Sequence, residues 1–147
     1  MRFIAYFVLL ACLSVQAFAG GNPDAILGTW LVPEKDAQVE VFKCGNKYCG
    51  KIVWLQKGVD EQGQPRKDSK NPNTALRSRT LMNLVFLENF SYDAKANEWS
   101  GGSLYDSRSG KSYTGYIKTN ANGTLTLTGY ILGMRWLSRS NTWTRVK

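Results

Sequence analysis

Short runs in which apolar and polar residues alternate, separated by turn signals, occupy most of the chain. The clearest is "TLTLTGYIL" from Thr124, where Leu125, Leu127 and Ile131 fall on one face and the threonines on the other. Alternation with a period of two is typical of strands that have one buried and one solvated face. The pattern therefore predicts an all-β protein, and no convincing amphipathic helix accompanies these runs.

About eight strands are predicted in this way. The connecting stretches "DAKAN", "SRSG" and "NANG" are short and rich in turn residues, so neighbouring strands should be antiparallel. A meander of this length can bury its apolar face by closing, and glycines within the runs supply the bends. We therefore predict one antiparallel up-and-down β-barrel, with strands within Gly28–Val32, Gln38–Leu55 (two strands), Leu81–Tyr92, Glu98–Tyr105, Lys111–Thr119, Thr124–Leu132 and Trp136–Val146, and with bends at Gly101, Gly102, Gly115 and Gly129.

Two cysteines lie close together in "KCGNKYCGKIVWL", which predicts a hairpin whose strands Cys44 and Cys49 crosslink across the turn. With these two residues directly opposed, Val41 lies opposite Ile52 and Val39 opposite Trp54. Val39, Val41, Ile52 and Trp54 then form the apolar inner face, while the disulfide lies on the outer face. The disulfide could be a structural crosslink that fixes the hairpin or a redox switch. Both roles stay open, although the pair lacks the CxxC motif of redox proteins.

The first residues have the layout of a cleavable export signal: Arg2, an apolar run, and small residues before a cut after Ala19. The alternative is a lipoprotein signal acylated at Cys12. We expect residues 1–19 to be the signal and residues 20–147 to be one barrel domain, periplasmic or secreted, with no further membrane span. In an oxidising compartment the two remaining cysteines form a disulfide.

The charge balance is basic, with 19 Lys and Arg against 11 Asp and Glu and a formal net charge of +8. Such a surface attracts anionic envelope components, and an exported chain is not expected to meet nucleic acid. The chain contains no histidine, which excludes histidine-based catalysis and zinc sites. We identify no catalytic residue, metal site or cofactor, because the carboxylates do not occur at a spacing that indicates a particular reaction.

Both ends of the barrel sequence carry a known signature. In an up-and-down barrel the first and last strands are neighbours, so Arg145 of "WTR" can lie across Trp30 of "GTW" and close one end. This pair resembles the signature of the calycins, which include lipocalins and fatty-acid-binding proteins. We also expect Trp30, Trp54 and Trp143 in the core.

Several separated motifs resemble the secreted bacterial proteins of domain-of-unknown-function family 2147. The resemblance covers nearly all of residues 20–147, and it implies a lipocalin-like barrel in the bacterial envelope without naming an activity. Asn83 and Ser138 depart from the family pattern, since glycine is more usual at both positions. The motifs are "YCGKIVWL" from Tyr48, "NPNTALRSR" from Asn71, "WSGGSLYDSRSGKSYTGYI" from Trp99 and "SRSNTWTR" from Ser138.

Candidate ligand-binding residues come from two stretches. Arg77 and Arg79 are spaced to share one face of an extended strand, where they could clamp an anionic headgroup or be solvated. Near the turn of the predicted hairpin "YDSRSGKSY", a ligand-binding and a turn-stabilising role are both open. The long polar stretch Gln56–Ala75 is either a lid or a solvated excursion. The candidate residues are Arg77, Arg79, Tyr105, Asp106, Lys111 and Tyr113.

These observations lead to a hypothesis of an exported binding protein that holds a small amphipathic or lipid-like ligand inside the barrel. The alternative is an interaction module or inhibitor that meets an acidic partner through its basic outer surface. A barrel interior filled by side chains would argue against the first hypothesis.

Overall fold

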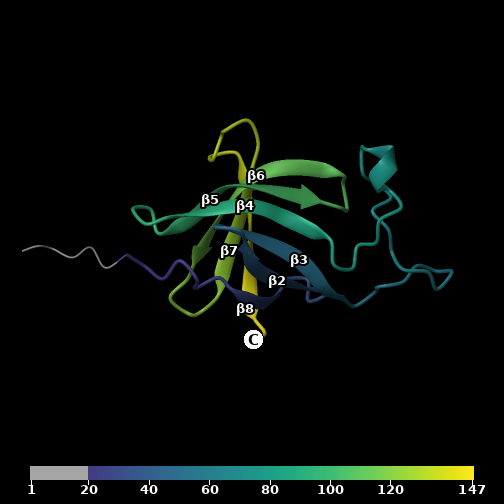
Figure 1. Cartoon of the computed structure of the whole chain (residues 1–147), viewed down its shortest axis with the longest axis horizontal. Coiled ribbons are helices and arrows are strands. Elements are labelled where there is room, and N and C mark those ends of the chain that lie inside the picture. Colours follow the sequence, from purple (N-terminus) through teal and green to yellow (C-terminus); the bar gives the residue numbers. More distant parts are fainter. Residues whose placement is uncertain (1–19) are drawn as a thin grey trace, which may run out of the picture.

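The chain folds as a closed barrel in which each strand is hydrogen-bonded to the next and the last strand returns to the first (Figure 1). The computed structural model describes residues 20–147, so the predicted signal segment and Cys12 lie outside the described residues. The strands are β1 (Gly28–Leu31), β2 (Ala37–Cys44), β3 (Lys47–Leu55), β4 (Val85–Asp93), β5 (Glu98–Asp106), β6 (Lys111–Thr119), β7 (Leu125–Tyr130) and β8 (Ser138–Arg145), and one short 3-10 helix, η1 (Thr74–Leu76), follows β3.

The predicted all-β, antiparallel up-and-down barrel is confirmed, and several strand ends differ from the prediction; β8, for example, begins at Ser138 rather than near Trp136. β4 begins at Val85 rather than near Leu81, because the chain turns through Asn83, whose φ is 64°. Asparagine tolerates this left-handed conformation better than most residues, so the chain can bend here without a glycine. β7 ends at Tyr130, and Ile131 is exposed rather than buried with Leu125 and Leu127 as expected.

The hairpin of β2 and β3 turns more tightly than the sequence suggested. The turn consists of two residues, so Cys44 pairs with Lys47 and Phe42 pairs with Cys49. Cys44 and Cys49 are disulfide-bonded across this diagonal, with their Cα atoms 5.8 Å apart. The predicted direct opposition of the two cysteines is therefore wrong, although the crosslink itself is present.

The tighter turn shifts the predicted register by two residues. Val39 lies opposite Ile52 and Val41 lies opposite Gly50, and because a shift of two preserves the faces, both valines and Ile52 are still buried. Trp54 lies beyond a bulge in the pairing, toward the end of β3, and is 39% exposed. The prediction that Trp54 belongs to the core is wrong for this reason.

Large aromatic side chains fill the interior of the barrel. Trp30, Phe90, Trp99 and Trp143 are nearly inaccessible to solvent. Phe90 occupies space that side chains on β5 and β6 would otherwise take, since a Cβ added at Gly102 would overlap the Phe90 ring. The glycine thus serves close packing at this point. The other buried members of the core are Ile26, Val39, Val41, Tyr48, Leu87, Ile117, Leu125 and Leu127.

The segment 20–27 closes one end of the barrel. The Arg145 guanidinium lies 4.2 Å from the centre of the Trp30 ring and donates hydrogen bonds to the carbonyl oxygens of Ala25 (2.7 Å) and Leu27 (2.8 Å). The Trp30 indole donates to the Ile26 carbonyl oxygen at 2.9 Å. Arg145 therefore ties the first strand, the last strand and the preceding segment together.

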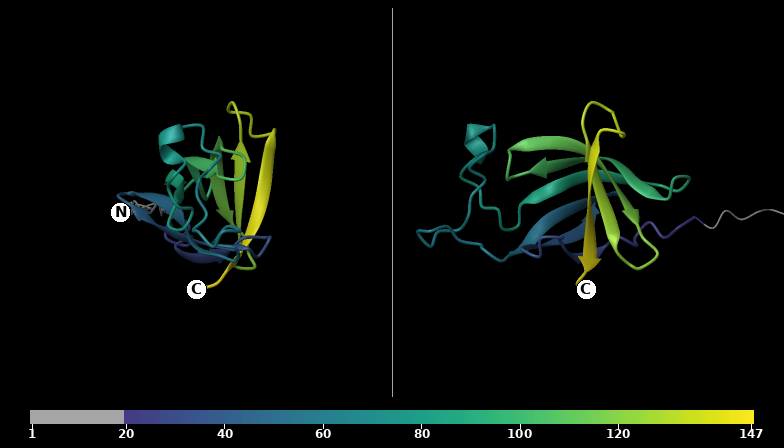
Figure 2. Two further views of the ribbon diagram at one scale, coloured as in Figure 1. Left: turned by 90° about the vertical axis from the view of Figure 1, so that its right-hand side faces the viewer. Right: turned by 180° about the vertical axis from the view of Figure 1, so that it is seen from behind.

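The opposite end, which we call the mouth, carries the connections 32–36, 56–84, 107–110 and 131–137. Figure 2 (left) looks onto this end, with the long connection between β3 and β4 in front of the barrel. The connection between β7 and β8 projects from the body at the top of Figure 1. No helix within residues 20–147 is long and apolar enough to cross a bilayer.

Candidate functional site

A buried carboxylate organises the long connection at the mouth. Asp68 is 0% exposed and accepts hydrogen bonds from three side chains. The Tyr105 hydroxyl donates to Oδ1 at 2.5 Å, while Asn71 Nδ2 and Arg79 Nε each donate to Oδ2 at 2.8 Å. Arg79 Nη2 is also 2.8 Å from Oδ2, and the guanidinium lies 5.6 Å from the centre of the Tyr105 ring. One acid thus joins Asn71 and Arg79 of the long connection to Tyr105 of β5.

The protonation states of this cluster follow from its contacts. Burial alone would raise the pKa of Asp68, but the hydrogen bonds from Tyr105, Asn71 and Arg79 outweigh it and hold that pKa below the ordinary 3.8. Burial and the bond to Asp68 raise the pKa of Tyr105 to about 12. At neutral pH the cluster therefore contains an ionised carboxylate, a protonated phenol and a guanidinium.

The backbone that carries the two arginines is a turn rather than the predicted strand. Asn71 Oδ1 accepts from the Asn73 amide at 2.9 Å, and Asn73 Oδ1 caps η1 at the Ala75 amide. Asparagine favours such turns because its side chain can replace a backbone acceptor. Arg77 Nε donates to the Asn71 carbonyl oxygen at 2.7 Å, while Arg79 reaches Asp68. The expectation that both arginines share one face of a strand is wrong.

The long connection, predicted to be either a lid or a solvated excursion, is tied to itself at several points. The Asp68 amide donates to the Arg79 carbonyl oxygen at 3.0 Å, and the Leu81 amide donates to that of Arg66 at 2.9 Å. Isolated bridges join Lys67 to Thr80 and Val59 to Pro65. The stretch from Arg66 to Leu81 is thus an ordered structure placed over the end of β5.

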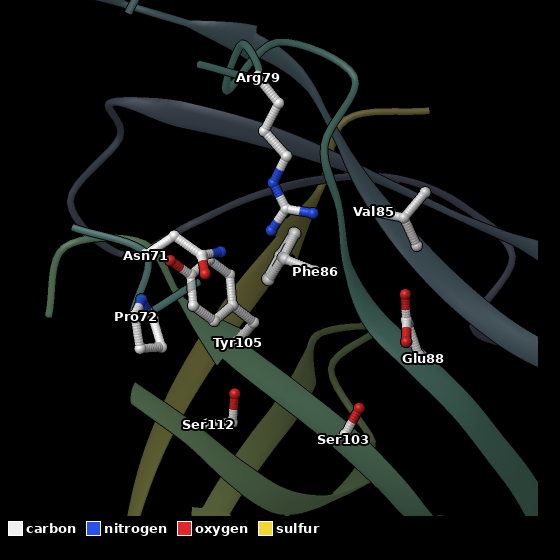
Figure 3. A pocket seen from close by; sticks show the side chains of 9 residues that line it. All are labelled: Asn71, Pro72, Arg79, Val85, Phe86, Glu88, Ser103, Tyr105 and Ser112. Atoms are coloured by element: carbon white, nitrogen blue, oxygen red, sulfur yellow. The ribbon is translucent and has the colours of Figure 1, made fainter. Parts of the chain in front are cut away.

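A hollow of about 260 Å³ lies between this structure and the sheet (Figure 3). Leu104 packs on the core, so its neighbour Tyr105 points away from the barrel interior toward the long connection. In Figure 3 the Arg79 guanidinium extends toward the Tyr105 and Phe86 rings. The lining residues are Asn71, Pro72, Arg79, Val85, Phe86, Glu88, Ser103, Tyr105 and Ser112.

The hollow has groups of opposite charge in its wall. Arg79 contributes a guanidinium whose Nη1 makes no hydrogen bond within residues 20–147, and Glu88 contributes an exposed carboxylate from β4. Ser103 and Ser112 supply hydroxyl groups, and Phe86 supplies an apolar surface. This wall can bind an anionic group, a hydrogen-bond donor and a short apolar segment at once.

A second hollow, of about 380 Å³, adjoins the first because Ser103 and Ser112 line both. It extends across β6 to the connection between β7 and β8. Its other lining residues are Tyr113, Thr114, Tyr130, Ile131 and Leu132. Within residues 20–147 no group of three or more cysteine, aspartate or glutamate side chains could hold a metal ion.

The six residues proposed from the sequence fall into three places. Arg77, Arg79 and Tyr105 gather around Asp68 and Asn71, and Tyr113 lines only the second hollow. Asp106 stabilises its own turn: it accepts from the Arg108 amide at 3.0 Å and from Ser109 Oγ at 2.7 Å. Lys111 follows this turn as an exposed residue, and neither Asp106 nor Lys111 lines either hollow.

The sequence reasoning missed the residue at the centre of the site. Asp68 stands three positions before the motif "NPNTALRSR" in a stretch rich in charged residues, where no alternation separates a buried acid from solvated ones. Its proximity to that motif was the one available signal. Glu88, Ser103 and Ser112 were missed because outward-facing polar residues on predicted strands resemble ordinary solvated positions.

Comparison with solved structures finds a barrel of the same kind. The chain is similar to protein HP1028 from Helicobacter pylori, which is described as belonging to the lipocalin family. The two are 25% identical, the match covers 83% of each chain, and the TM-score is 0.72.

The search of curated proteins finds no match. A family model described as "Uncharacterized protein conserved in bacteria (DUF2147)" matches residues 28–145, which run from the first residue of β1 to the last residue of β8. By this match over the entire barrel, the chain belongs to the DUF2147 family of uncharacterized proteins conserved in bacteria.

Proposed function

We propose that the protein is exported to the bacterial envelope and binds a small amphipathic ligand at the mouth of its barrel. The signal-like residues 1–19 and the disulfide between Cys44 and Cys49 support an oxidising, extracytoplasmic location. The lipocalin-like fold supports binding of a small ligand, because barrels of this size commonly hold one at or inside the mouth.

One observation carries the proposal: Arg79 is fixed over the first hollow by a fully buried acid. Asp68 Oδ2 accepts a hydrogen bond from Arg79 Nε and forms an ion pair with Nη2. These contacts orient the guanidinium and leave Nη1 available for a ligand. A group held in its binding position before the ligand arrives loses little entropy on binding. Such preorganisation is expected for a binding residue and is not needed by an arginine that only solvates the surface.

The side chains of Trp30, Phe90, Trp99 and Trp143 fill the interior, which argues against the ligand inside the barrel that the sequence suggested. We therefore propose that the ligand binds at the mouth instead. A hollow of about 260 Å³ accommodates a headgroup or a short molecule, and the adjoining hollow accommodates a further segment. The ligand would direct an anionic group to Arg79, a donor to Glu88 and an apolar part along Phe86.

Native mass spectrometry of protein purified without denaturation from the envelope of its host tests this proposal. We expect a reproducible additional mass on the wild type that is lost on delipidation and is absent from Arg79→Gln. Ser103→Leu should also lose it, because Ser103 lines both hollows. Ser91→Leu is the matched control: Ser91 is an exposed serine on β4 that lines neither hollow.

Two results would contradict the proposal. A bare mass for the wild type under these conditions would show that no ligand is carried. An additional mass that persists in both Arg79→Gln and Ser103→Leu would place the ligand elsewhere on the protein.

A further inference from the structure

The connection between β7 and β8, residues 131–137, exposes an unusual amount of apolar surface. Leu132 is 86% exposed and Trp136 is 81% exposed, and Ile131 and Leu137 are also exposed. Half of the large hydrophobic residues exposed within residues 20–147 lie in these seven positions. Isolated exposed hydrophobics are normal, whereas a cluster of this kind marks an interaction surface. We call residues 131–137 the apolar loop.

Leu132 occupies a position that neither solvation nor backbone geometry favours. Its φ is 53°, in the left-handed region, and the next residue, Gly133, has a φ of 70°. Asparagine or glycine adopts this conformation with less strain than leucine, and either would also be better solvated. A residue that conflicts with its local structure and makes no compensating buried contact points to a role in function.

The apolar loop is held firmly at its base. Arg135 folds back onto the barrel, where its Nη2 lies 2.6 Å from Oε1 of Glu98, a side chain that is almost fully buried. The guanidinium also lies 4.1 Å from the centre of the Tyr116 ring and 5.8 Å from that of Tyr130. Leu132 and Trp136, on either side of this anchor, are presented outward on an ordered support.

The charge of the surrounding strands indicates what covers this loop. Residues 107–147 contain seven Lys and Arg and no acid. Arg108, Lys118 and Arg135 pair with acids of earlier segments, whereas the exposed Lys111 makes no ion pair within residues 20–147. Arg139, next to the loop on β8, is exposed and makes no ion pair within the described residues. A second copy of this chain would bring like charges together, which disfavours a homodimer through this face.

We propose that the apolar loop inserts Leu132, Trp136 and Leu137 into the interface of an anionic lipid bilayer, with the acid-free strands β6–β8 facing the headgroups. Tryptophan and leucine side chains partition into the boundary between headgroups and acyl chains, and nearby cations add attraction to anionic lipids. The loop projects from the body of the barrel (Figure 1), which suits insertion into a surface. Ile131 and Leu132 also line the second hollow, so the test below includes Trp136, which lines neither hollow, and a variant that blocks the hollows without changing the loop.

Vesicle flotation and tryptophan fluorescence test the proposal with the folded residues 20–147. The probe is vesicles of equal parts phosphatidylglycerol and phosphatidylcholine, compared with phosphatidylcholine alone. We expect the wild type to float with the anionic vesicles and its fluorescence to be quenched by brominated acyl chains. Leu132→Asn and Trp136→Gln should each weaken binding by roughly tenfold or more, because each removes a large apolar side chain from the lipid.

Thermal melting and two control variants distinguish membrane insertion from misfolding and from ligand binding. Leu132→Asn suits the left-handed backbone, so loss of folding is not expected, and thermal melting checks this. Val146→Asn changes an exposed apolar residue beyond the end of β8, near the closed end of the barrel, and should leave binding unchanged. Ser103→Leu, which blocks the hollows, should also still bind vesicles, so failure of the proposed ligand site is distinguishable from failure of this proposal.

Three outcomes would overturn the proposal. The first is no binding to anionic vesicles. The second is binding that high salt abolishes and that both loop variants retain, which would indicate a purely electrostatic surface for an acidic partner. The third is a wild-type dimer in analytical ultracentrifugation that both loop variants lose, which would show that a second copy covers the loop.

Discussion

Replacing Asp68 by asparagine should release the ordered structure at the mouth while leaving the barrel intact. Asparagine has the same shape, but it presents an NH2 group to donors that now point at carboxylate oxygens. This NH2 group takes the place of one carboxylate oxygen. Either Tyr105, which donates to Oδ1, or Asn71 and Arg79, which donate to Oδ2, must then lose their acceptor. Hydrogen bonds to charged groups contribute about 1.5–3 kcal/mol each, and removing one partner leaves a buried donor unpaired. Since Arg79 is about a third exposed, we expect the lower part of this range, about 2 kcal/mol.

Hydrogen exchange measured by NMR reports this change directly. The amides of Asp68, Asn71 and Leu81 are hydrogen-bonded within the ordered stretch, so their protection measures how often it opens. A loss of about 2 kcal/mol corresponds to about a 30-fold fall in protection. Asp60→Asn is the matched control, because Asp60 is an exposed acid of the same connection and the charge change is identical.

The pH dependence provides a second test of the same reasoning. The pKa of Asp68 is lower in the folded protein than its ordinary value, so the ionised carboxylate stabilises the folded state. That contribution is complete above the unfolded pKa, about 3.9, and is lost as the pH falls through the lower folded pKa. The difference between wild type and Asp68→Asn should therefore be largest near neutral pH and should shrink below about pH 4. Equal protection in the two proteins at pH 7, or a difference that does not change on acidification, would refute the account of this cluster.

Three further predictions concern the barrel. Cys44→Ser with Cys49→Ser should lower the free energy of unfolding by about 2 kcal/mol in urea, because the crosslink closes a small ring, and an unchanged midpoint would show no stabilising role. Gly102→Ala should cost about 1–3 kcal/mol in the same assay because its Cβ meets the Phe90 ring, and Phe90→Leu should recover part of the loss if that contact is the cause. Arg145→Gln should lower the free energy of unfolding by about 2 kcal/mol, because it removes two hydrogen bonds to carbonyl oxygens and the contact with Trp30. The exposed Arg139→Gln should be nearly neutral, and equal effects of the two substitutions would show that Arg145 does not stabilise the closed end.

The barrel was predictable because alternation and short turns act locally and agree along the chain. A two-residue error in the hairpin left Val39, Val41 and Ile52 on the correct face, since the period of a strand is two. Trp54 was assigned wrongly because its burial depends on a bulge and on its place near the end of β3, neither of which is visible in a residue pattern. Hydrophobic periodicity thus predicts which face is buried and gives little information about where along the strand burial ends.

The site was less predictable because its contacts join residues that are distant in the chain. The Asp68–Tyr105 bond spans 37 positions, and the partner of Arg79 lies on an irregular segment without periodicity. From the motif alone Arg77 and Arg79 are equivalent, yet only Arg79 reaches the buried acid while Arg77 bonds to a backbone oxygen. Roles of this kind are set by the path of the long connection, which no local rule encodes.

The two functional proposals involve the same structural device. Each connection beside the hollows is fixed by an arginine paired with a buried acid and placed near a tyrosine ring: Arg79 with Asp68, and Arg135 with Glu98. A buried acid that loses its arginine loses its closest cation at a high cost, so each pair resists opening more than an exposed ion pair would. The barrel itself does not need either pair, because its strands are hydrogen-bonded to one another around the closed circuit. The two arginine–acid pairs therefore stabilise the β3–β4 and β7–β8 connections. These connections lie on the two sides of hollows that share Ser103 and Ser112 as lining residues.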